Sequence, residues 1–153
     1  MLRESLLSNL LPLRGMDRIQ TACAILKSPK NQFLLQLRDS NPSIQYRNHW
    51  ANFGGIIEKG ESPRECLVRE LREELGFEAR LVRFWMVWPW RNFMVHVFEV
   101  DITINIQDLS LHEGAGMRFF TKEEILQTEL AFCLNEVYRE YFRVRGIEST
   151  KTG

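Results

Sequence analysis

The hydrophobic residues of this chain follow two periods, one typical of strands and the other typical of helices. Mostly apolar runs, rich in β-branched and aromatic residues, predict strands over 18–26, 33–38, 78–88, 93–104 and 117–120. Helical spacing predicts two longer helices, over about 63–75 and over 132–145. The first strand has little polarity, so we expect neighbouring elements to cover both of its faces.

Turns and polar loops separate these elements at 28–31, 39–49, 89–92 and 107–116. The turn at 89–92 lies between two long apolar runs and predicts a β-hairpin. Thr121 and Glu124 have capping-box spacing and predict a short helix. Strands occur before and after the predicted helix, and a terminal helix is available to cover the other face of the sheet. This order predicts an α/β fold in which a sheet lies between helices. Residues 1–16 resemble an amphipathic arm and 148–153 a frayed tail, which leaves 17–147 as one domain.

The helix predicted over 63–75 has clear signals at both ends. Ser62 suits the N-cap, Pro63 suits the first helical position, and Glu65 has the spacing that completes a capping box. Gly76 is a natural stop, because the residue after the last turn often takes a positive φ.

This helix has an apolar stripe and an acidic arc beside it. The stripe contains Leu67, Val68, Leu71 and Leu75, and the arc contains Glu70, Glu73 and Glu74. The three carboxylates lie in the last two turns, where the helix dipole is negative and where like charges four residues apart repel. Carboxylates placed against both effects indicate a missing cation, and a hard divalent ion such as Mg²⁺ prefers oxygen ligands.

The stretch from Gly54 to Phe77 resembles a known family. Its pattern G-x5-E-x7-R-E-U-x-E-E-x-G-U, with U a bulky aliphatic or aromatic residue, is the Nudix box. The specified places are filled by Gly55, Glu61, Arg69, Glu70, Leu71, Glu73, Glu74, Gly76 and Phe77. The resemblance implies the Nudix fold, a mixed curved β-sheet in an α/β/α sandwich. It also implies Mg²⁺- or Mn²⁺-dependent hydrolysis of a nucleoside diphosphate linked to another moiety, by water attack on phosphorus.

The resemblance assigns roles to particular residues. Glu70, Glu73 and Glu74 are expected to bind the metal together with the backbone carbonyl of Gly54. Arg69 is four residues from both Glu65 and Glu73, so we expect it to orient carboxylates through ion pairs. Glu61 is expected to act behind the metal ligands.

Two positions outside the box resemble MutT-type members. Glu113, in the 107–116 loop, matches a glutamate that binds metal or acts as the base, and Arg38 matches a phosphate-binding arginine. Phe53 departs from the proline that many relatives have before the two glycines, which puts the local loop geometry in doubt. The aromatic cluster Trp85, Trp88, Trp90 and Phe93 is explained mainly by burial in the sheet, with stacking on a nucleobase as the alternative. The three histidines lack metal-ligand spacing, and Cys66 has no histidine partner that would make it a nucleophile.

The composition of the chain limits the classes of binding partner. Lys and Arg total 20, as do Asp and Glu, which argues against a nucleic-acid polymer or an anionic membrane as partner. Three cysteines without CxxC spacing suggest reduced thiols in the cytoplasm, and we expect neither a signal peptide nor a membrane span.

The preferred function is therefore a cytoplasmic Nudix pyrophosphohydrolase that acts on a small nucleotide. A nucleoside triphosphate ranks ahead of a nucleotide sugar or ADP-ribose, on the matches at Glu113 and Arg38 alone. An enzyme like isopentenyl-diphosphate isomerase and a non-catalytic nucleotide-recognition domain are weaker alternatives, because the box keeps all its glutamates. The sequence leaves the oligomeric state open, a homodimer included.

Overall fold

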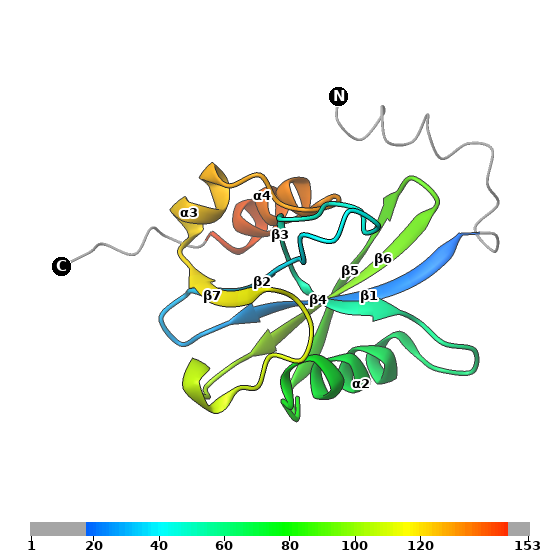
Figure 1. Cartoon of the computed structure of the whole chain (residues 1–153), viewed down its shortest axis with the longest axis horizontal. Helices are drawn as coiled ribbons and strands as arrows, with labels where there is room; N and C mark the ends of the chain where they lie inside the picture. Colours follow the sequence, from blue (N-terminus) through cyan, green and yellow to red (C-terminus); the bar gives the residue numbers. More distant parts are fainter. Residues whose placement is uncertain (1–17, 147–153) are drawn as a thin grey trace.

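The computed structural model describes residues 18–146, which form one layer of strands between two layers of helices (Figure 1). The strands are β1 (Ile19–Lys27), β2 (Phe33–Leu37), β3 (Trp50–Ala51), β4 (Phe53–Ile56), β5 (Val82–Trp90), β6 (Phe93–Asp101) and β7 (Gly116–Phe120). The helices are α2 (Pro63–Leu75), α3 (Lys122–Gln127) and α4 (Leu134–Arg145), with one 3-10 turn, η2 (Ile106–Asp108). The predicted arm at 1–16 and tail at 148–153 lie outside the described residues.

The sheet is mixed and has its longest strands at its centre. Its order is β3-β2-β1-β6-β5, with β4 also paired to β1 and β7 paired to β2. The central β1 and β6 run parallel over their whole length, from Ile19↔Phe93 to Lys27↔Asp101, and the other named pairs are antiparallel. The predicted α/β architecture with a mixed sheet is confirmed.

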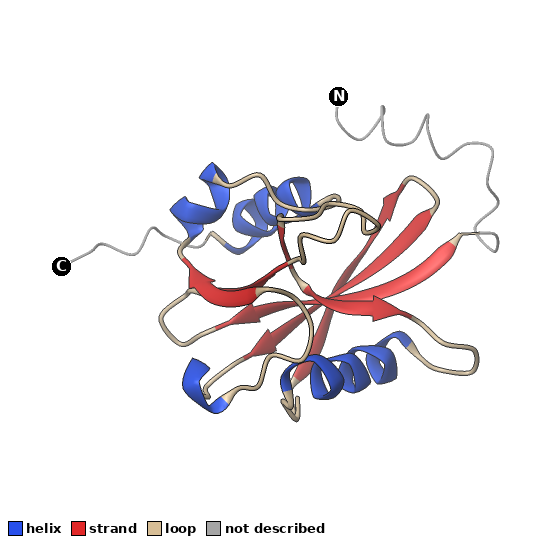
Figure 2. Cartoon of the chain, in the orientation of Figure 1, coloured by secondary structure: helices blue, strands red, loops and turns tan. Residues whose placement is uncertain are grey.

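Helices cover the two faces of the sheet (Figure 2). Helix α2 packs on one face over a core that contains Leu67, Leu71 and Leu75. Helix α4 packs on the other face over a core that contains Val137, Tyr138 and Tyr141. Strand β1 contributes to both cores, as its low polarity predicts. Within residues 18–146, no helix combines the length and the apolar character needed to cross a bilayer.

Helix α2 has the predicted bounds. The Ser62 hydroxyl accepts a hydrogen bond from the Glu65 N–H at 3.1 Å, and Pro63 is the first helical residue. Gly76 ends the helix with φ 62°, and its N–H donates to the Arg72 carbonyl at 2.9 Å. The bond from the Ser62 cap is half of the predicted capping box. A complete box is present at α3, where the Thr121 hydroxyl and the Glu124 carboxylate exchange bonds with each other's backbone.

The hairpin differs from its predicted boundaries. Strand β5 begins at Val82, later than the predicted 78, and continues through Pro89 and Trp90, where the sequence predicts the turn. Trp90 pairs with Phe93, so only residues 91 and 92 form the turn. A proline is tolerated there because β5 is the last strand of the sheet path and one side of its backbone needs no ladder partner.

The last helix also begins later than predicted. Helix α4 starts at Leu134, because Phe132 has a φ of 57°, which is incompatible with a right-handed helix. A positive φ is an outlier for a bulky residue, and it directs attention to what Phe132 contacts.

The sheet opens beside β1. Strand β4 pairs with the first half of β1, from Thr21↔Ile56 to Ala24↔Phe53. Strand β2 is registered with β1 at Lys27↔Phe33. Strands β2 and β4, which both pair with β1, therefore diverge from each other. The link from β3 to β4, residues 51–53, crosses the opening between them.

Candidate functional site

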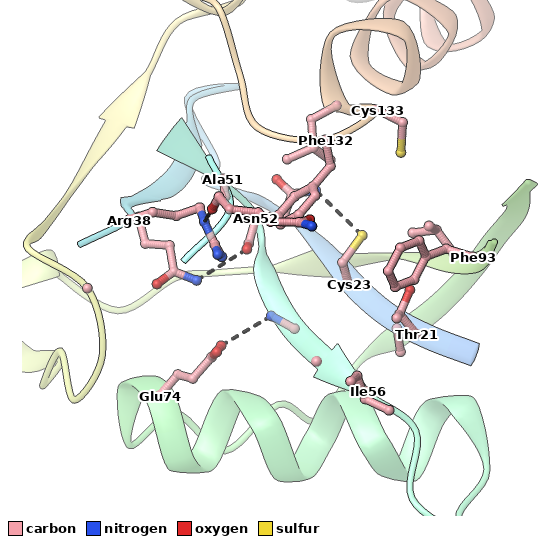
Figure 3. Close-up of a pocket in the computed structure, with 18 of the residues that line it drawn as sticks. Thr21, Cys23, Arg38, Ala51, Asn52, Ile56, Glu74, Phe93, Phe132 and Cys133 are labelled. Atoms are coloured by element: carbon pink, nitrogen blue, oxygen red, sulfur yellow. Dashed lines mark hydrogen bonds between the residues drawn. The ribbon is translucent and has the colours of Figure 1, made fainter. Parts of the chain in front are cut away.

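A cavity of about 640 Å³ lies where the sheet opens (Figure 3). One part of its lining is polar and includes Gln36, Arg38, Gly54, Glu74 and Glu113. The other part is apolar and includes Trp90, Phe93, Val95, Phe132 and Leu134. Its volume is within the range of small-molecule sites, about 300–1,000 Å³.

Glu74 is the buried acid of this cavity, with only 4% of its surface exposed. Its Oε2 accepts a hydrogen bond from the Gly54 N–H at 3.1 Å, which joins the last turn of α2 to β4. Burial raises the pKa of Glu74 to about 8, and the charges of Glu70 and Glu113 add to the effect. Burial thus raises the pKa of Glu74 more than the like-charge repulsion that the spacing of the helix predicts. At neutral pH, and without a metal, Glu74 is mostly protonated.

Glu70 lies against the glycine that opens the box. A methyl group at Gly55 would be 2.3 Å from Glu70 Oε1, so only glycine leaves room for the carboxylate. Burial raises the pKa of Glu70, while a hydrogen bond from Arg69 Nη1 at 3.0 Å opposes that rise.

Arg69 gathers the carboxylates on the outer side of α2. It donates two bonds to Glu61, from Nε at 2.7 Å and from Nη2 at 3.1 Å, and these bonds lower the pKa of Glu61 to about 2. Its Nη1 also lies 3.2 Å from Glu73, whose side chain is 58% exposed. The predicted pairing with Glu73 is therefore present. The main partner is Glu61, eight residues away, and not Glu65.

Glu113 reaches the same cavity from the loop before β7. The loop is fixed to α2 because the His112 N–H donates to the Glu74 carbonyl at 2.9 Å. It is fixed to β2 because the Ala115 N–H donates to the Leu37 carbonyl at 2.8 Å. Gly114 has φ +87°, and a methyl group there would be 2.7 Å from that same Leu37 oxygen.

Arg38 lies on the opposite side of the polar part, just after β2. Its Nε donates to the Gln45 carbonyl at 2.9 Å, and its guanidinium carbon is 4.9 Å from the centre of the Phe132 ring. Burial lowers the pKa of Arg38, and the charges of Asp39, Glu113 and Glu74 oppose this effect. The guanidinium stays positively charged, since an arginine loses its proton only far above neutral pH.

The aromatic cluster divides between the cavity and the core. Trp90 and Phe93 line the cavity, with ring centres 5.9 Å apart and planes 25° from parallel. Trp85 packs edge-on against Tyr141 at 5.2 Å, and Trp88 is buried in the core. Burial alone explains these last two, as expected.

The histidines and Cys66 have ordinary structural contacts. His96 is hydrogen-bonded to Gln20 at 2.8 Å, and His49 is 3.9 Å from Glu129. Cys66 is a buried residue of α2, and burial raises the pKa of its thiol to about 12.

The sequence does not predict several residues of the cavity lining, among them Gln36, Asn52 and Phe132. Gln36 and Asn52 are buried polar residues, and the Gln36 Nε2 donates to the backbone carbonyl of Asn52 at 3.3 Å. Nothing in the local sequence indicates that Phe132 leaves the helix. The glutamine within an apolar strand was the one usable signal, because a polar residue in a buried strand needs a partner.

The carboxylates suit a hard cation chemically, although they are not gathered around one. Within residues 18–146, no three His, Cys, Asp or Glu side chains are grouped so that they could hold a metal ion as they stand. Glu70 and Glu73 are instead paired with Arg69. The raised pKa values of Glu70 and Glu74 show that this site stabilises carboxylate charge poorly without further positive charge. Carboxylate and carbonyl oxygens are the donors that Mg²⁺ and Mn²⁺ prefer.

Comparison with known proteins gives the family. The model described as "NUDIX domain" matches residues 17–141. The chain belongs to the NUDIX domain family. This Nudix chain is 35% identical to a CTP pyrophosphohydrolase of Escherichia coli over 85 residues, which cover 54% of this chain and 62% of that protein. It is 37% identical to an NAD-capped RNA hydrolase, NudC, of Pseudomonas entomophila over 91 residues, which cover 58% of this chain and 32% of that protein.

A solved structure extends the match over most of the Nudix chain. The solution structure of the E. coli ORF135 protein has a TM-score of 0.67 and 27% identity, and the match covers 87% of this chain and 95% of that one. The chain spans less than two thirds of the two curated relatives. The family prediction is confirmed, and the family and these relatives together indicate a Nudix hydrolase.

Proposed function

We propose that this Nudix protein is a metal-dependent pyrophosphohydrolase of a small nucleotide, with a nucleoside triphosphate as the preferred substrate. One observation carries the proposal. Glu74, Glu113 and Arg38 line one cavity, and Glu70 is close enough for its charge to act on Glu74. A hydrolase of phosphoric anhydrides needs both groups, carboxylates for a cation and a guanidinium for phosphate.

The chain's own residues have distinct roles in this proposal. Glu70, Glu73, Glu74 and Glu113, with the Gly54 carbonyl, would hold Mg²⁺ or Mn²⁺. When bound, such an ion neutralises phosphate charge and makes water a better nucleophile. Arg69 keeps the outer carboxylates in position through its bonds to Glu61. Glu74, whose pKa is about 8 before the ion binds, would give up its proton on joining the metal ligands.

Arg38 would bind and orient the phosphate groups. Its side chain is already held by Gln45 and lies against Phe132, so little rotational entropy remains to be lost on binding. The apolar part of the cavity can take the rest of the nucleotide and exclude water from it.

The preference for a triphosphate draws support from the E. coli relative named a CTP pyrophosphohydrolase. ADP-ribose and nucleotide sugars remain the alternative substrates, because a cavity of about 640 Å³ has room for a mononucleotide and part of a second group. A cytoplasmic location belongs to the same proposal, and it is supported by three free cysteines at 23, 66 and 133.

A substrate panel tests the proposal. The purified chain is incubated with the common nucleoside triphosphates, ADP-ribose and nucleotide sugars, and released phosphate and pyrophosphate are measured with Mg²⁺, with Mn²⁺ and with excess EDTA. We expect metal-dependent turnover that rises toward alkaline pH, since the carboxylates act deprotonated. Full turnover in EDTA would exclude the metal mechanism.

A matched pair of variants on α2 locates the activity. Glu70→Gln removes a proposed ligand charge and should lower kcat/KM by at least about a hundredfold, equivalent to ~2.7 kcal/mol of barrier. Glu65→Gln removes the same charge from an exposed position near the start of the helix and should leave activity unchanged. Equal activities of the two variants would place the chemistry elsewhere.

A further inference from the structure

Asn52 is a buried polar residue at the junction of the polar and apolar parts of the cavity. It is 8% exposed, lines the cavity and lies in the short link between β3 and β4. Figure 3 shows it with Arg38 on one side and Cys23 on the other. The roles proposed above for metal and phosphate binding do not use this side chain.

Tyr138 fixes the orientation of the Asn52 amide. The Tyr138 hydroxyl donates to Asn52 Oδ1 at 2.6 Å, and Tyr138 is fully buried in α4. Burial raises the pKa of Tyr138 well above its usual value, so this hydroxyl keeps its proton. The carbonyl oxygen of the amide is thereby occupied, and its NH₂ group must point the other way.

Among the residues that the structure describes, the NH₂ group of Asn52 has only a weak partner. Its Nδ2 donates to Cys23 Sγ at 3.7 Å, and sulfur is a poor acceptor. Burial raises the pKa of Cys23 to about 11, so the partner is a neutral thiol at physiological pH. An amide NH₂ has two hydrogens, and one such contact leaves donor capacity for an oxygen atom in the cavity.

The surroundings of Asn52 are suited to a flat ring. Trp90, Phe93 and Phe132 line this part of the cavity with Val95, and Phe132 has the unusual φ of 57°. Aromatic and apolar side chains stack on a heterocyclic base without regard to its identity. Any discrimination between bases in this part must therefore come from a polar group.

We propose that Asn52 is a specificity-determining residue that donates a hydrogen bond to a carbonyl oxygen of the nucleobase, and that Tyr138 is its positioning residue. This inference rests on the proposed hydrolysis of nucleotides. A donor-only amide favours bases with an exocyclic carbonyl, namely cytosine, uracil and guanine. It disfavours adenine, which has no carbonyl oxygen and carries an amino donor where guanine has its exocyclic oxygen.

The test compares the full chain with three variants. Asn52→Asp keeps the size and the acceptor for Tyr138 but removes the donor. Tyr138→Phe removes the hydroxyl that orients the amide. Asn105→Asp makes the same chemical change at an exposed residue before η2 and serves as the control.

We measure kcat and KM with CTP, UTP, GTP and ATP, together with binding of the same nucleotides in EDTA by tryptophan fluorescence. Wild type and Asn105→Asp should prefer the carbonyl-bearing bases over ATP by about tenfold, the value of one well-made hydrogen bond. Asn52→Asp should lose that preference. Tyr138→Phe should weaken it several-fold, mainly in KM and in the EDTA binding constants.

An unchanged base preference in both Asn52→Asp and Tyr138→Phe would overturn the inference, as would a wild type that prefers ATP. If Asn52→Asp does not fold, Tyr138→Phe alone decides between these outcomes. Failure of the proposed function is distinguishable, because a wild type that hydrolyses no nucleotide still reports base preference through binding in EDTA.

Discussion

Replacing Glu74 by glutamine should remove a pH dependence from the stability of the metal-free protein. Glutamine has the size of a protonated glutamate, and its side-chain oxygen can still accept the bond from the Gly54 N–H. The substitution therefore mimics the state that the folded protein favours, since burial raises the pKa of Glu74 from 4.5 to about 8.

The sign of the effect follows from proton binding. Between pH 4.5 and about 8 the folded protein holds a proton on Glu74 that the unfolded chain has lost. Because the folded state binds more protons, its stability is complete below the unfolded pKa and falls as pH rises through the folded pKa. One pKa unit corresponds to about 1.4 kcal/mol, so the full shift corresponds to about 5 kcal/mol. We expect a measured loss of about 2–5 kcal/mol, with the lower figure if water reaches the ionised carboxylate.

Urea denaturation in EDTA from pH 5 to pH 9 measures this directly. Wild type should lose stability across the range, while Glu74→Gln should keep it and match wild type at pH 5. Glu73→Gln is the control, because Glu73 is the adjacent residue of the same helix and its side chain is more than half exposed. Parallel profiles for wild type and Glu74→Gln would refute the assignment of a proton to Glu74. Mg²⁺ added at pH 8 should restore stability to wild type and less to Glu74→Gln.

Four further changes separate packing from chemistry. Gly55→Ala should cost under about 1 kcal/mol of stability, because only the movable end of Glu70 is displaced, yet it should abolish most activity. Gly54→Ala should lower the free energy of unfolding by about 1–3 kcal/mol, measured by thermal denaturation. The added methyl group would lie 2.1 Å from a backbone oxygen of β1, which cannot move aside easily. Arg69→Lys loses the two-bonded pairing and should weaken Mg²⁺ binding about 10–100-fold by titration, with an unchanged fold by circular dichroism. Arg38→Ala should mainly raise KM for nucleotides, and unchanged kinetics would return it to a surface role.

Local signals explain why α2 could be predicted to the residue. Ser62, Pro63 and Gly76 act within one turn of the backbone they terminate, so no distant contact can override them easily. The acidic arc could also be predicted from the local sequence, because Glu70, Glu73 and Glu74 all lie in this one helix.

The rest of the cavity depends on distant contacts that the local sequence does not encode. Asn52 is buried because it meets Tyr138, 86 residues later in the chain. The position of the hairpin turn also depends on distant contacts. Pro89 would end strand β5 only if its backbone nitrogen had to donate a hydrogen bond to a neighbouring strand. Whether β5 is an edge strand is a property of the whole sheet. Glu113 was predicted through resemblance alone, and its position depends on bonds from its loop to α2 and β2.

The acidic residues of the box are neutralised in two different ways in the described structure. The outer carboxylates share Arg69, which lies within 4 Å of Glu58, Glu61, Glu70 and Glu73. Glu74 instead is bonded to the Gly54 N–H and keeps a proton, because it is buried and flanked by other acids. One guanidinium cannot neutralise four carboxylates, and a proton on Glu74 is lost near pH 8. Glu70, Glu73 and deprotonated Glu74 would hold a divalent cation, whose charge would offset both deficits. The contacts in the described structure therefore leave the acid-rich end of α2 short of positive charge, and the proposed metal would supply it.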